Sequence, residues 1–194
     1  MNPMNRRAWL LGAASMVATL AFPFGAAHAH SPYRQWDIFR KKHLQILTSR
    51  SDLNGDNIGD EWVALLLERL PLSHAMVSRA RDMRRVASLL KTDQAKLAIL
   101  SYDDAKAMIS GAAGFEEYSP MPLQVMLDNG SHLLVARENL PLHHAYVVTA
   151  TLMEEARPLH LRVPLDGQLG MKVHPGARSA ALGESLEMPP ADAT

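Results

Sequence analysis

Between residues 43 and 110 the sequence alternates short apolar runs with segments of helical periodicity, and this alternation limits the folds open to the chain. The apolar runs predict strands at residues 43–48, 74–78 and 96–101. Apolar residues at helical spacing predict helices at residues 60–70, 82–91 and 102–110. Repeated strand–helix units favour right-handed crossovers. We therefore expect an α/β fold with a mainly parallel sheet flanked by helices on both faces.

The pattern changes further along the chain. Two apolar runs, 123–127 and 131–137, flank Asp128-Asn129-Gly130, and Asn-Gly between such runs is a strong turn signal. Residues 142–156 predict a helix that follows Pro141. From residue 158 the chain is rich in Pro and Gly and loses its periodicity. We expect one α/β domain over residues 30–157, and an irregular segment over residues 158–194 that packs on the domain or trails from it.

The first 29 residues are typical of an export signal. Arg6-Arg7 precede an uncharged apolar run that ends at Ala27-His28-Ala29, a small-residue cleavage site. The tandem arginine also fits a twin-arginine signal. An uncleaved membrane anchor is the alternative, since about 20 apolar residues can span a bilayer. Cleavage would leave 165 of the 194 residues, with 18 basic and 20 acidic side chains, and predicts a soluble periplasmic protein.

Composition and missing motifs exclude several classes of function. The chain has no cysteine, which excludes disulfides, thiolate metal sites and a cysteine nucleophile. Its 20 basic and 20 acidic residues show none of the basic excess of a nucleic-acid-binding protein. It contains no G-x-S-x-G, no G-x-G-x-x-G and no P-loop. We therefore expect neither an enzyme nor a bound cofactor.

Polar side chains follow the three predicted parallel strands, where ligands bind in sheets of this class. They are supplied by Thr48-Ser49, Ser78-Arg79 and Ser101-Tyr102, and by Asn54 in a polar stretch, residues 49–59, that is predicted to be a loop. Hydroxyls and helix N-termini suit a small anion, and Arg79 adds a guanidinium for a carboxylate. The same hydroxyls also suit helix N-caps, and the two roles are compatible.

Two metal sites are alternatives to an anion site. Asp52, Asn54 and Asp56 match the first three ligand positions of a calcium-binding loop. However, Asn57 stands where that loop needs Gly, and Val63 stands where it needs Glu. We expect a loop that caps the next helix there, with no metal. Cleavage of the signal at residue 29 would make His30 the N-terminus, and an N-terminal His with a second imidazole can bind copper. A copper carrier is therefore an alternative function.

Three segments of the chain together carry a family resemblance: the strand, polar loop and helix of residues 44–70, the stretch from Arg84 to Ala105, and Val173-His174-Pro175-Gly176-Ala177. In this order along the chain they resemble the TAXI subgroup of periplasmic solute-binding proteins of the tripartite (TRAP) transporters. The resemblance implies one lobe of a type II periplasmic-binding-protein fold. It also implies transport of a small anionic solute and membrane transporter subunits as partners.

The chain departs from that family in length and in its loops. Family members have two lobes and are about half as long again, with a second lobe inserted after the strand predicted at residues 131–137. Ser78-Arg79-Ala80-Arg81 stands where the family has glycines. A single lobe cannot close on a ligand through a hinge. The alternatives are therefore a periplasmic protein–protein interaction module that has lost its ligand, and a homodimer in which a second copy replaces the missing lobe.

Overall fold

A computed structural model describes residues 43–112, 114–155 and 161–186. The predicted export signal and His30 lie outside the described residues. The described part of the chain forms an α/β fold around a six-stranded mixed sheet in the order β2-β1-β3-β5-β4-β6. Its strands are β1 (Gln45–Ser49), β2 (Met76–Ala80), β3 (Leu97–Ser101), β4 (Leu123–Asp128), β5 (His132–Arg137) and β6 (Lys172–Val173).

The sheet is mostly parallel. Strand β1 pairs in parallel with β2 and with β3, as the repeated strand–helix units predict. Strand β5 runs antiparallel to both β3 and β4, and the short β6 pairs in parallel with β4. The carboxyl ends of β1, β2, β3 and β4 therefore share one edge with the start of β5. We call this the carboxyl edge, and the opposite one the amino edge.

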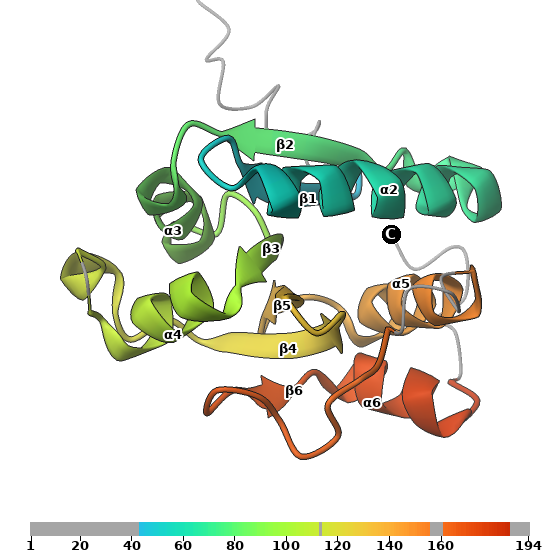
Figure 1. Cartoon of the computed structure of the whole chain (residues 1–194). Coiled ribbons are helices and arrows are strands. Elements are labelled where there is room, and N and C mark those ends of the chain that lie inside the picture. The colour runs from blue at the N-terminus through green and yellow to red at the C-terminus, as the bar shows by residue number, and fades with distance from the viewer. Residues whose placement is uncertain (1–42, 113, 156–160, 187–194) are drawn as a thin grey trace, which may run out of the picture. The chain divides into compact units, whose positions relative to one another are not determined.

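Helices cover both faces, which confirms the predicted layering (Figure 1). Helices α3 (Met83–Lys91) and α4 (Tyr102–Ser110) pack on one face, in a buried cluster with Leu47 and Leu100. Helices α2 (Leu53–Arg69), α5 (Leu142–Glu155) and α6 (Pro175–Leu182) contribute to a second cluster on the other face, with Ile46 and Ile99. Neighbouring strand residues thus point into different clusters, because side chains alternate along a strand. Two short 3-10 turns, η1 (Pro71–Ser73) and η2 (Glu116–Tyr118), complete the elements.

The expected loop over residues 49–59 is wrong, because α2 begins at Leu53. Asp52 is its N-cap and accepts a hydrogen bond from the Gly55 N–H at 3.0 Å, which satisfies one of the free donors of the first turn. Gly59 lies against β1, and a Cβ there would stand 2.7 Å from Thr48 Cγ2. The glycines that suggest a loop instead let the helix approach the sheet closely.

The β4–β5 hairpin and the predicted helix after Pro141 are confirmed. Gly130 closes the hairpin turn with a φ of +90°, a conformation that favours glycine.

The segment after residue 158 is more regular than predicted, because residues 172–173 add a strand and residues 175–182 form a helix. His174 is buried and caps α6, accepting from the Gly176 N–H through Nδ1, while its Nε2 bonds the Leu140 carbonyl at 3.1 Å. Gly176 lies against α5, where a Cβ would meet the Leu142 carbonyl oxygen at 2.1 Å. This close helix contact depends on tertiary structure and leaves no periodic pattern in the sequence.

Candidate functional site

The carboxyl edge gathers polar side chains from segments far apart in the sequence. In the antiparallel pairing of β3 with β5, Ser101 stands opposite His132, and in that of β4 with β5, Asp128 stands opposite Leu133. Ser49 ends β1 two strands away from β5. Three hydrogen-bonded groups occupy this edge.

The first group joins the start of α2 to the hairpin. Asp52 Oδ2 lies 3.0 Å from His132 Nε2, while its Oδ1 caps the helix. On the other side of the ring, His132 Nδ1 lies 2.9 Å from Ser131 Oγ. Asn129 Oδ1 accepts from the backbone N–H groups of Ser131 and His132 and fixes the turn. The imidazole is thereby held between two elements that are 80 residues apart.

The second group surrounds Asp128, whose side chain is fully buried. It accepts hydrogen bonds from the Tyr102 hydroxyl, the Gly130 N–H at 2.7 Å, and Arg162 Nε and Nη2 at 3.1 and 2.8 Å. Burial by itself would raise the pKa of Asp128, but these donors outweigh it and lower the pKa below the usual range. The Arg162 side chain remains 67% exposed, so its guanidinium also faces solvent.

The third group connects β1, α2 and β2. Thr48 is buried and donates to Asp56 Oδ1 at 2.7 Å. Arg79 donates to Asp56 Oδ2 at 2.9 Å and also to Asp60, one helical turn further along α2. These two carboxylates raise the pKa of Arg79 and leave its charge more than balanced. Burial would raise the pKa of Asp56, but the Thr48 and Arg79 hydrogen bonds lower it instead.

The structure brings only some of the predicted site residues together. Ser49, Ser101 and Tyr102 lie at the carboxyl edge, and Ser101 also caps α4, as its N-cap interpretation predicts. Thr48 is turned into the fold toward Asp56. Asn54 lies in the first turn of α2, with its side chain exposed.

Two predicted residues are displaced because β2 runs to Ala80 rather than Ser78. Ser78 therefore stands in mid-strand, opposite Leu47, and not at a strand end. Arg79 is held by the α2 carboxylates and stands one strand beyond β1.

Four residues of the edge were missed by sequence reasoning: Asp52, Asp128, His132 and Arg162. Asp128 and His132 flank the predicted hairpin turn, so their sequence position was visible. The position of His132 opposite Ser101, and of Asp128 one strand further on, depends on β5 inserting antiparallel between β3 and β4, which no local pattern indicates. Arg162 is held at the edge by an isolated antiparallel β-bridge, in which its backbone N–H and C=O groups both hydrogen-bond the backbone of Asp128.

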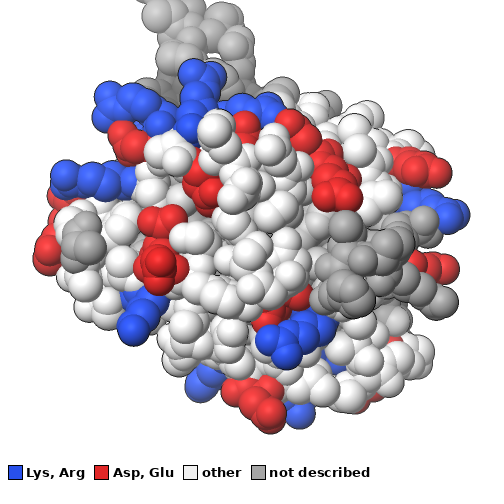
Figure 2. All heavy atoms as spheres, in the orientation of Figure 1, with Lys and Arg blue, Asp and Glu red and all other residues white. Residues whose placement is uncertain are grey.

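Charged groups surround an uncharged area in this part of the molecule. Figure 2 shows acidic and basic side chains around a central surface of uncharged ones, over the region where β3 and β5 lie in Figure 1. Within the described ranges, no group of three or more His, Asp or Glu side chains is arranged to hold a metal ion. The calcium-like residues Asp52 and Asp56 are used as a helix cap and as a partner of Arg79.

Comparisons of the chain with family models, with curated proteins and with solved structures return no match. Among the helices of the described segments, none has the length and apolarity needed to cross a membrane.

Proposed function

We propose that this chain binds a small anionic solute of the carboxylate type at the carboxyl edge. The observation that carries the proposal is the convergence of polar side chains from β1, β3, β4 and β5 on one edge of a largely parallel sheet. Ligands of open α/β sheets bind outside the carboxyl ends of the strands. The hydroxyls of Ser49, Ser101 and Tyr102 lie at this edge. They already hydrogen-bond Ser51, Asp104 and Asp128, and in this proposal they exchange those partners to orient the solute.

The charge for the carboxylate comes from Arg162 in this proposal, and not from Arg79. Arg79 already pairs with two carboxylates, whereas Arg162 pairs with one, that of Asp128, interacts also with the Tyr102 hydroxyl, and is the more exposed of the two arginines. A guanidinium has five N–H donors, and the hydrogen bonds to Asp128 use two of its nitrogens, Nε and Nη2. Arg162 therefore keeps N–H donors for a second carboxylate.

The fold class supports a wider role as one lobe of a type II periplasmic-binding-protein fold, working with TRAP-type membrane transporter subunits. The chain-order features behind this proposal are an export-like N-terminus, three consecutive strand–helix units and a reversed strand. The proposed setting is the periplasm, where a second copy or a partner protein would cover the single lobe.

Isothermal titration calorimetry with acetate, succinate and glutamate, and with neutral succinamide as control, tests the proposal. We expect at least one carboxylate to bind while succinamide does not. Arg162→Gln should weaken that binding about tenfold or more, since a charge-assisted hydrogen bond contributes about 1.5–3 kcal/mol. Arg79→Gln is the matched control and should change the affinity less than about threefold.

Arg162→Lys keeps the charge and should restore part of the affinity, which separates loss of binding from loss of fold. If no carboxylate binds, or if the two Gln variants behave alike, the proposed site is wrong. Size-exclusion chromatography with light scattering, with and without solute, reports whether a second copy supplies the facing surface.

A further inference from the structure

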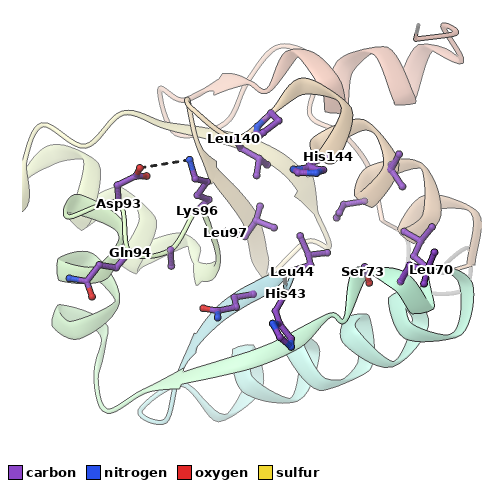
Figure 3. Close-up of a pocket in the computed structure, with 16 residues that line it drawn as sticks. His43, Leu44, Leu70, Ser73, Asp93, Gln94, Lys96, Leu97, Leu140 and His144 are labelled. Atoms are coloured by element: carbon purple, nitrogen blue, oxygen red, sulfur yellow. Dashed lines mark ion pairs between the residues drawn. The ribbon is translucent and has the colours of Figure 1, made fainter. Parts of the chain in front are cut away.

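A hollow lies at the amino edge, away from the hydrogen-bonded groups of the carboxyl edge (Figure 3). It has a volume of about 630 Å³ and opens where β1 and β3 begin, between the end of α2 and the start of α5. Cavities of this size, with mostly apolar walls and a few polar groups, are typical of small-molecule sites. The sequence patterns that predict the carboxyl edge give no indication of a site at the amino edge.

Its walls are apolar and come from four parts of the fold. Leu44 precedes β1, Leu70 follows α2, Leu97 begins β3, and Val148 belongs to α5. Leu97 and Val148 are almost fully buried and form part of the core behind the hollow. These walls suit the hydrocarbon body of a ligand, because burial of apolar surface drives its transfer from water.

The Asp and Lys side chains of the lining lie at one end, while the uncharged Ser73 stands beside Leu70 at the other. In Figure 3 the Asp93–Lys96 pair lies at one end of the hollow and Leu70 at the other, with Leu97 between them. Lys96 Nζ is 3.7 Å from Asp93 Oδ2 and donates to the Asn139 carbonyl at 3.3 Å, and its side chain is 39% exposed. Asp93 is shared, since Arg137 Nε lies 3.5 Å from its other oxygen. Lys96 and Arg137 carry two positive charges and Asp93 carries one negative charge, so this cluster has a net charge of +1.

We propose that the hollow binds an amphipathic monocarboxylate, with its alkyl body against the leucine walls and its carboxylate at Lys96. The apolar walls recognise the chain, and the net positive charge at the Lys96 end selects an anionic head over a cationic one. This ligand class differs from the small polar solute proposed for the carboxyl edge, and the inference does not depend on that proposal.

A titration series of butyrate, octanoate and decanoate by calorimetry on the full protein, below micelle concentrations, tests this. Each added methylene should tighten binding by up to about fourfold, the gain expected for one buried CH₂. Decylamine, which has the same chain and the opposite charge, should bind at least tenfold more weakly than decanoate.

Two variants locate the site. Lys96→Gln should lower the affinity for decanoate about tenfold and leave the affinity for decanol unchanged. Lys106→Gln on α4, outside the hollow, should change neither affinity. Val147→Trp places a large ring on a wall of the hollow and should abolish binding of every long-chain probe. Thermal unfolding of each variant confirms that the fold is retained.

Several results would overturn the inference: no binding of decanoate, equal binding of decylamine, or identical behaviour of the two Lys variants. A protein that is dimeric by light scattering and excludes decanoate would show that a second copy covers the hollow instead.

Discussion

The two edges of the sheet are built in opposite ways. At the carboxyl edge, Asp52 caps α2 and hydrogen-bonds His132, while Asp128 accepts hydrogen bonds from Tyr102 at the start of α4 and from Gly130 in the hairpin turn. At the amino edge, leucines from separate elements leave a hollow with one charged end. The difference follows from the direction of the parallel strands, because the helices that follow β1 and β3 begin at the carboxyl edge and need polar caps there.

The comparison also separates two sources of stability. The carboxyl edge depends on satisfied hydrogen bonds around a buried carboxylate, whereas the structure near the amino edge depends on close backbone packing where α6 crosses α5. Substitutions at each end of the sheet should therefore change the free energy of unfolding by different amounts.

Gly176→Ala should cause the largest loss of stability. Its Cβ would meet backbone atoms of α5, at 2.1 Å from the Leu142 oxygen and 2.9 Å from the Tyr146 nitrogen, so the two helices must separate. We expect the free energy of unfolding to fall by about 3 kcal/mol, the upper part of the range for overpacking. Urea denaturation measures it. Pro175→Ala, at the exposed neighbouring position, is the control and should cost less than about 1 kcal/mol. Similar losses for both would disprove the packing role of Gly176.

Asp128→Ala should destabilise the carboxyl edge by about 2–3 kcal/mol. The substitution leaves the Tyr102 hydroxyl and the Gly130 N–H without their acceptor, and unsatisfied polar groups cost about 1–3 kcal/mol. Chemical denaturation at pH 7 checks this value. Asp103→Ala, in the exposed first turn of α4, should change stability by less than about 0.5 kcal/mol. A loss no greater than that of the control would mean that the Asp128 group contributes nothing to stability.

The two edges should respond to acid in different pH windows. Burial lowers the pKa of His174 below its usual 6.5, an effect only partly offset by the Leu140 carbonyl. The folded protein therefore resists protonation of His174, so stability is complete above about pH 6.5 and falls as the pH drops below it, by at most about 1.4 kcal/mol per pH unit. The lowered pKa of Asp128 has the same sign of effect in a more acidic window: its contribution is complete above about pH 3.8 and is lost only below that value.

His174→Asn tests this assignment, because asparagine can still cap α6 but does not titrate. The unfolding free energy of the variant should be flatter between pH 6.5 and 5 than that of the unmodified protein. An unchanged slope would show that His174 is not the group responsible.

Arg79→Gln should have the smallest effect on stability, about 0.5–1 kcal/mol. Its side chain is about one third exposed, and ion pairs near the surface contribute little. The loss should shrink at 1 M salt, because salt screens exposed charges. A loss above about 2 kcal/mol would place Arg79 with the buried networks rather than with surface pairs.

Local sequence patterns predict the bounds of a helix correctly where its own capping residues determine both ends. Helix α4 spans the predicted residues 102–110, because Ser101 caps one end and Gly111, with a φ of +70°, ends the other. Residues 49–59 were misassigned because glycine and asparagine are typical of loops, while here Asp52 caps a helix and Gly59 packs against β1. A small polar residue or a glycine can thus belong to a loop or to a helix, depending on which element packs against it.

The candidate site was predictable only in part. Hydroxyls at the ends of β1 and β3 follow from strand periodicity, and Ser49, Ser101 and Tyr102 do lie at that edge. The partners of Arg79 were not predictable, because its two carboxylates face it only after α2 packs beside β2.

The sequence by itself determined the alternation of strands and helices, the hairpin turn and the helix caps, since these depend on side-chain periodicity and on interactions a few residues apart. Tertiary structure alone decided that β5 enters between β3 and β4, that Asp128 and His132 join the carboxyl edge, and that a hollow opens at the other edge. These features arise from contacts between segments many residues apart, whose free energy depends on how the elements pack and is not recorded in any local pattern.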